Sequence, residues 1–87
     1  MGQKIKGKII IKSVRYFKND WGIAEALPLE FKGEQPIVDA KGTFIIKGEM
    51  IDPAVEREYN IIAEQVNDPK WGQQYNIISF ATNLHVN

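Results

Sequence analysis

The chain has 87 residues, of which 44% are hydrophobic and 25% are charged. This length supports one domain, and the composition is typical of a folded domain and excludes a disordered segment. Eleven basic residues balance eleven acidic ones, so the chain is not a uniformly basic nucleic-acid-binding domain. Any site for a polyanion must come from a local cluster of basic residues.

The first predicted strand covers Lys4–Tyr16, where isoleucine and lysine alternate with a period of two. The inward parity carries Ile5, Gly7, Ile9 and Ile11, and the outward parity carries Lys4, Lys6, Lys8 and Lys12. Ile10 and Val14 stand on the lysine parity, which predicts a bulge or coil where the inward face changes. A turn at Lys18–Trp21 and a second strand over Gly22–Glu30 complete a hairpin.

The remaining elements are also short. Phe31–Lys41, with two glycine or proline breaks, predicts a loop, and Gly42–Ile51 predicts the third strand. Asp52 followed by Pro53 suits the start of a helix, so we expect at most a single helical turn there. The fourth and fifth strands are predicted over Tyr59–Val66 and Tyr75–Ala81, and a tail over residues 82–87.

These elements predict an all-β fold for residues 1–81. Five short strands, with at most a short helical turn between the third and fourth, are typical of a small, partly open barrel of the oligonucleotide/oligosaccharide-binding (OB) kind. An SH3-like barrel is the alternative, because it too has five strands and a helical turn. Both are single-domain folds.

The residue types that catalysis and metal binding need are nearly missing from the sequence. There is no cysteine, and the single histidine, His85, falls in the predicted tail, so zinc and thiol chemistry are not expected. No phosphate-cradling glycine loop is present, and carboxylates such as Glu25 and Glu64 alternate with apolar residues as solvent-side strand positions do. We therefore expect no catalytic residue, no metal and no cofactor in this chain. With no apolar run of about 18–20 residues, we also expect no membrane contact and a cytoplasmic location.

A nucleic-acid surface is the hypothesis that the remaining patterns favour. The lysine row of the first strand repeats at about 6.6 Å on one face, which is comparable to the phosphate spacing of an extended single strand. Trp21 and Trp71 each precede a turn glycine, and exposed aromatic rings in such loops of an OB barrel could stack bases. Each pattern has an alternative: the lysines could only solubilise the strand, and the tryptophans could close the barrel ends.

Two blocks of the sequence resemble the N-terminal domain of RecD-like ATP-dependent DNA helicases, the family of the exodeoxyribonuclease V alpha subunit. The more specific block is Asn67-Asp68-Pro69-Lys70-Trp71-Gly72-Gln73-Gln74-Tyr75, preceded by Glu56-Arg57-Glu58-Tyr59. The second is Ile5-Lys6-Gly7-Lys8-Ile9, followed by Tyr16-Phe17-Lys18-Asn19-Asp20-Trp21-Gly22-Ile23. Together they cover most of the chain in the order that the family has.

The resemblance implies an OB-like accessory domain of a helicase or exonuclease subunit in DNA repair, with ATP hydrolysis elsewhere in the protein. It implies that single-stranded DNA, or the motor domains of the same or a partner protein, is the binding partner. The residues predicted to contact nucleic acid are Lys6, Lys8, Lys18, Trp21, Lys70, Trp71, Gln73 and Tyr75. The alternative is a protein-interaction or structural barrel without nucleic-acid binding, for which the balanced charge is the best argument. A small enzyme is the weakest hypothesis, because no nucleophile and base stand together.

Overall fold

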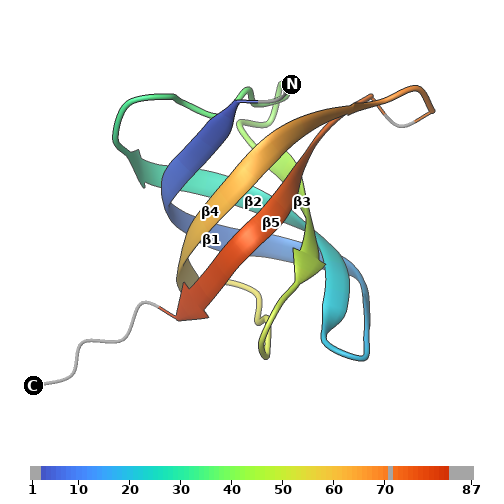
Figure 1. Cartoon of the computed structure of the whole chain (residues 1–87). Helices are drawn as coiled ribbons and strands as arrows, with labels where there is room; N and C mark the ends of the chain where they lie inside the picture. Colours follow the sequence, from blue (N-terminus) through green and yellow to red (C-terminus); the bar gives the residue numbers. More distant parts are fainter. Residues whose placement is uncertain (1–2, 71, 83–87) are drawn as a thin grey trace, which may run out of the picture.

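Five strands form from the alternating segments, and they confirm the all-β prediction. A computed structural model describes residues 3–70 and 72–82. The strands are β1 (Lys4–Lys18), β2 (Trp21–Phe31), β3 (Phe44–Glu49), β4 (Glu58–Asp68) and β5 (Gly72–Thr82). They wrap into a small barrel, with β4 and β5 in front in Figure 1.

The barrel is closed, in the order β1-β2-β3-β5-β4, and this agrees with a small barrel of the OB-like kind. Neighbouring strands are antiparallel except β3 and β5, which are parallel. The sequence predicted a partly open barrel, and the difference lies at this parallel seam. Only Ile46 with Tyr75 and Lys47 with Asn76 are paired there. A short seam is enough to close the ring of strands.

β1 belongs to two parts of the barrel wall. Its first half pairs with β4 from Lys4 to Ile10, and it pairs with β2 from Gly7 to Lys18. The register against β2 shifts at three places, which confirms that this strand is irregular where a bulge or coil was predicted, and changes the parity that faces inward. One strand therefore supplies side chains to two separate outer faces.

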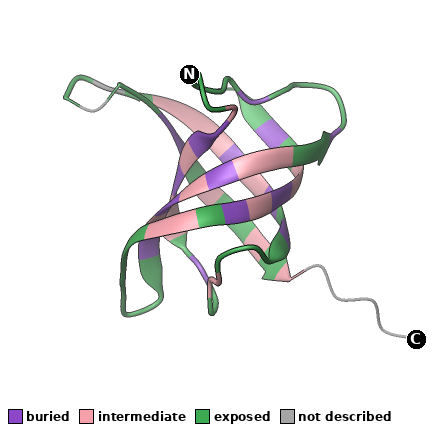
Figure 2. Cartoon of the chain, turned by 180° about the vertical axis from the view of Figure 1, so that it is seen from behind, coloured by how far each residue is buried: buried purple, intermediate pink, exposed green. Residues whose placement is uncertain are grey.

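The core consists of inward residues from all five strands. Its aromatic members pack edge to face, with Phe44 between Phe31 and Tyr75, while Tyr59 stacks on the half-buried Phe80. The buried residues alternate with exposed ones along the strands (Figure 2). The buried apolar set is Ile5, Ile9, Ile11, Ala24, Ala26, Phe31, Phe44, Ile46, Met50, Tyr59, Ile61, Ala63 and Tyr75.

The connections differ in how far the sequence predicted them. Asn19 and Asp20 both have positive φ (53° and 62°), which makes the β1–β2 connection a tight two-residue turn. The helical turn allowed between β3 and β4 does not form, because Asp52 and Glu56 also adopt positive φ (51° and 69°). The Tyr59 hydroxyl organises this loop instead, accepting a hydrogen bond from Ala54 N and donating one to Asp52 O. In the part of the chain that is described, no helix is long and apolar enough to cross a membrane.

Candidate nucleic-acid interface

An outer face with exposed aromatic rings is built by β1, β2, β3 and the adjoining part of β5. Because outward residues alternate along β2, Trp21, Ile23 and Glu25 share this face, and their cross-strand partners extend it. One row of partners runs across four strands, through Tyr16, Ile23, Lys47 and Asn76. A second row runs through Lys18, Trp21 and Glu49. We call the residues Tyr16, Lys18, Trp21, Ile23, Lys47, Glu49 and Asn76 the aromatic face.

Two rings dominate this face. Tyr16 is 49% exposed and Trp21 is 41% exposed, and their centroids lie 6.1 Å apart with planes inclined by 67°. The tight turn at Asn19 and Asp20 brings the two rings together, because it joins their strands directly. The pair presents π surface to solvent in a geometry that restrains the indole, which favours stacking of a planar ligand.

A shallow hollow adjoins the rings beside the β3–β5 seam. It is lined by Trp21, Lys47, Gly48, Glu49, Asn76 and Ile77. At Gly48, β3 approaches β5 so closely that a Cβ atom on this residue would lie 3.1 Å from the Cβ of Ile77. The hollow thus offers an indole, an ammonium group and an amide around one small depression, together with the carboxylate of Glu49.

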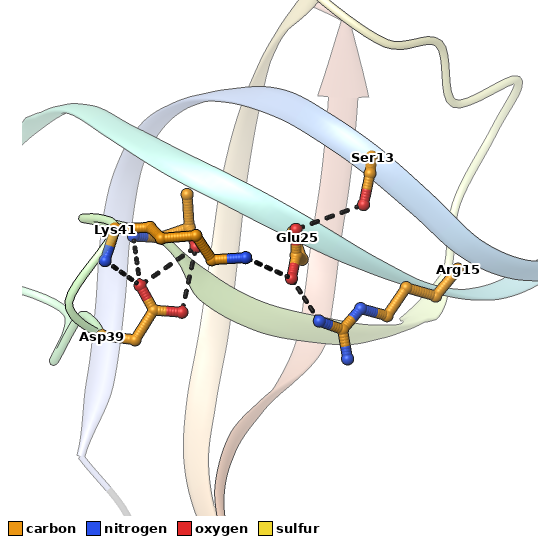
Figure 3. Close-up of polar contacts among 6 residues, drawn as sticks. Ser13, Arg15, Glu25, Asp39 and Lys41 are labelled. Carbon is orange, nitrogen blue, oxygen red and sulfur yellow. Dashed lines mark hydrogen bonds and ion pairs between the residues drawn. The ribbon is translucent and has the colours of Figure 1, made fainter.

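A cluster of charged and polar side chains surrounds the Glu25 carboxylate farther along the same face (Figure 3). The Glu25 side chain is only 12% exposed, and it accepts hydrogen bonds from Arg15 and, at 3.3 Å, from Ser13 Oγ. Lys41 Nζ lies 3.6 Å from Glu25 Oε2. The hydrogen bond from Arg15, with smaller contributions from the charges of Arg15 and Lys41, lowers the pKa of Glu25 below its ordinary value. The cluster fastens the β2–β3 loop to the barrel.

Asp39 organises the end of that loop. Its Oδ1 accepts hydrogen bonds from the backbone N–H groups of Lys41 (2.9 Å) and Thr43 (3.1 Å), and Thr43 Oγ1 lies 3.2 Å from Oδ2. The bond from Thr43 N is the largest cause that lowers the pKa of Asp39 below its ordinary value. This arrangement places Lys41 over Glu25.

Lower stability in acid is expected from these two carboxyls. Because the pKa of each is lowered by folding, its contribution to stability is complete above the ordinary values of 4.5 and 3.8 and is lost as the pH falls through the folded pKa. Urea unfolding measured across the acid range should show this loss, with a smaller pH dependence in Glu25→Gln and in Asp39→Asn. Glu49→Gln removes an equal charge from the same face and is the control. An unchanged pH dependence in both test variants would contradict the assignment.

Lys6 and Lys8 lie on another side of the barrel. Their cross-strand partners on β4 are Ile62 and Asn60, so they face outward from the wall that β1, β4 and β5 make. They line a depression of about 520 Å³ together with Gly7, Glu30, Lys32, Asn60, Ile61, Ile62, Ser79 and Ala81, which we call the lysine groove. The structure therefore separates these two predicted residues from the tryptophan at the β1–β2 turn.

The β4–β5 connection carries three further predicted residues. Lys70 and Gln73 are exposed near the turn, where Asp68 pairs with Gly72, and Trp71 lies outside the described residues. In Figures 1 and 2 this turn and the β1–β2 turn extend from opposite ends of the barrel, on the same side of each view. Of the predicted set, only Lys18 and Trp21 are thus brought together on the aromatic face.

Tyr75 requires a correction. It was predicted as a nucleic-acid contact, but it is only 2% exposed, and its ring packs on Phe44. Its hydroxyl accepts a hydrogen bond of 2.8 Å from the backbone N–H of Ile37. The inward parity of β5 places it in the core, where it holds the β2–β3 loop and cannot meet a ligand on the surface.

The sequence prediction missed Lys47 and Asn76. Both fall in ordinary alternating strand positions, and nothing in their local sequence marks them as part of a site. Their place on the aromatic face follows from the pairing of β2 with β3 and of β3 with β5. The only signal in the sequence was the alternation of inward and outward residues: Lys47 follows the buried Ile46, so its side chain faces outward.

The fold and this face define the chain as a closed, five-stranded, OB-like barrel with aromatic rings on its outer surface. Among residues 3–70 and 72–82 there is no group of three or more side chains suited to hold a metal ion. Comparisons with protein-family models, curated proteins and solved structures give no match to this chain. The function must therefore be argued from the surface itself.

Proposed function

We propose that this barrel binds single-stranded nucleic acid across the aromatic face. The observation that supports this most is the exposed Tyr16–Trp21 pair, held at a tight turn beside Lys18 and Lys47. Neither lysine forms an ion pair within the described residues, so both charges can meet phosphate groups. A base stacked on Trp21 would contribute about 1–3 kcal/mol of binding free energy.

The proposed binding is not specific for sequence. Stacking accepts every base, because every base has a π face, and lysine contacts to phosphate carry no sequence information. Glu25 and Glu49 lie on the same side and oppose a polyanion, and the chain has no net charge to add attraction. We therefore expect weak binding that depends strongly on salt.

DNA is the proposed ligand, and a helicase is the proposed setting. Both come from the resemblance of the Asn67–Tyr75 block to RecD-like helicases. In that setting the barrel is an accessory domain that contacts the single strand or docks to the motor domains. The motor, and with it any ATP hydrolysis, would lie outside this chain.

Trp21→Ala is expected to weaken binding of oligo-dT by about tenfold, which corresponds to about 1.4 kcal/mol of stacking free energy. Trp71→Phe makes Trp21 the sole indole, so quenching of its fluorescence by oligo-dT at low salt reports contact at this face. Leu29→Ala, which truncates an exposed apolar residue near the other end of β2, is the control and should bind normally. No quenching of the Trp71→Phe protein at tens of micromolar would refute the proposal.

A protein-interaction module is the second candidate. It is favoured by exposed apolar side chains in the loops around β3, namely Ile37, Val38, Ile51 and Val55. These side chains are 42–69% exposed and lie outside the aromatic face. If oligo-dT does not bind, calorimetric titration of the chain with the motor portion of a RecD-like helicase tests this candidate, and a heat of binding that disappears in Ile51→Asp would support it.

A further inference from the structure

We propose that the lysine groove is a second polyanion site, which binds the phosphodiester backbone of a single strand without contacting its bases. The groove lies on the β1–β4–β5 wall, whereas Trp21 lies on β2 beside β3. The proposal does not depend on stacking at Trp21, so each of the two sites can fail without the other.

The register of three strands arranges the groove. In one row Lys8 pairs with Asn60, which pairs with Ala81; in the next, Lys6 pairs with Ile62, which pairs with Ser79. Lys6 and Lys8 are two residues apart on one strand face, so their stems are about 6.6 Å apart. This gives two cations in a line beside Asn60 and Ile62 of β4, with the small side chains of Ser79 and Ala81 beyond them on β5.

Charge in the groove is unbalanced. Among the described residues, three lysines line it, Lys6, Lys8 and Lys32, against the single carboxylate of Glu30, which is the cross-strand partner of Lys8 on β2. None of these lysines forms an ion pair with a described residue, whereas Lys12 pairs with Glu56, and both Arg15 and Lys41 pair with Glu25. In a chain of zero net charge, the free cations gathered here attract an anion.

The lining favours a sugar-phosphate backbone over bases. Among the described residues, no aromatic side chain lines the groove, so they form no stacking platform there. Ser79 and Ala81 are small, and the volume of about 520 Å³ accommodates several sugar and phosphate units of an extended strand.

An acidic peptide fits this surface less well. Peptides that bind sheets gain much of their affinity from main-chain hydrogen bonds at a free strand edge. β4 is paired with both β1 and β5, and β1 is paired on both sides from Gly7 to Ile10, so at the groove an open strand edge remains only over residues 4–6. The geometry points to the phosphodiester backbone as the occupant.

The test uses a fluorescently labelled oligonucleotide of about 16 units that lacks bases, at the upper end of site sizes for OB folds. We expect it to bind the whole chain at low salt, and Trp21→Ala to leave this binding unchanged. The double variant Lys6→Gln/Lys8→Gln should weaken it at least fivefold, and the slope of log K against log salt should fall by about 0.7 for each phosphate that is no longer neutralised.

Lys12→Gln/Lys41→Gln is the matched control, because it removes two lysines that are already paired with carboxylates. Failure of the base-free strand to bind, or equal weakening in the two double variants, would overturn the inference. Tighter binding of a polyglutamate of similar charge would overturn it as well, and would assign the groove to a protein. Absence of oligo-dT quenching in Trp71→Phe, with base-free binding intact, would refute only the aromatic face.

Discussion

Replacing Tyr59 by alanine is expected to lower the free energy of unfolding by about 4 kcal/mol, within the range measured for buried aromatic residues. Tyr59 is fully buried, and its ring stacks on Phe80 with centroids 4.5 Å apart. Its hydroxyl lies 2.9 Å from Ala54 N and 3.0 Å from Asp52 O. Truncation therefore leaves a cavity and removes both hydrogen bonds that shape the β3–β4 loop. Urea unfolding followed by circular dichroism measures the destabilisation.

Tyr59→Phe separates the two contributions. It keeps the ring and deletes only the hydroxyl, so we expect a destabilisation of about 1–2 kcal/mol from the backbone groups of Ala54 and Asp52 that lose their partner. If both Tyr59 variants unfold at the same urea concentration, packing contributes nothing beyond the hydroxyl. If Tyr59→Phe matches the native protein, the hydroxyl does not hold the loop.

Gly7→Ala is expected to cost about 3 kcal/mol, the upper end of the range for overpacking. A Cβ atom at this position would lie 2.5 Å from Phe31 Cγ and closer still to the carbonyl oxygen of Glu30. Gly7 pairs with Phe31 on one side and with Ile61 on the other, so the strand cannot move away from one neighbour without approaching the other. The whole β1–β2 pairing must shift.

Lys8→Ala is the control for Gly7→Ala. It changes the adjacent outward position and meets no crowding, so the free energy of unfolding should change by less than about 0.5 kcal/mol. The comparison is made by urea unfolding under identical conditions. A Gly7→Ala protein as stable as Lys8→Ala would show that the approach of β1 to Phe31 is not tight.

Alternation in the sequence predicted the fold because burial follows it closely. Ile5, Ile9 and Ile11 are buried in β1 as their parity requires, and Phe44 and Ile46 are buried in β3. The path of the loop from Asp52 to Glu56 was harder to predict from the sequence, because it depends on Tyr59, which lies outside the loop. An N-cap aspartate and a following proline are local signals, and the hydrogen bonds of the Tyr59 hydroxyl outweigh them.

The surface was less predictable than the core. The sequence placed Lys6 and Lys8 in one predicted nucleic-acid surface with Lys18 and Trp21, but pairing with β4 turns Lys6 and Lys8 to a different wall. Which strands become neighbours depends on closure of the whole barrel, and a local pattern does not contain that information. Tyr75 shows the same limit: it was predicted at the start of the fifth strand and close to Trp71, which suggested exposure, but its side chain faces the core.

The ladder between β1 and β4 also constrains the order in which this protein folds. It joins Lys4 to Glu64 and Ile10 to Glu58, whereas β1, β2 and β3 form a local meander. Pairing of such distant segments carries a large loop-closure cost and slows folding. A nascent chain that has reached only β3 therefore keeps one edge of β1 unpaired and its isoleucines uncovered, which is a state prone to association. Pulse-labelling hydrogen exchange should protect the β1–β2 amides before those of β4, and simultaneous protection would argue against this order.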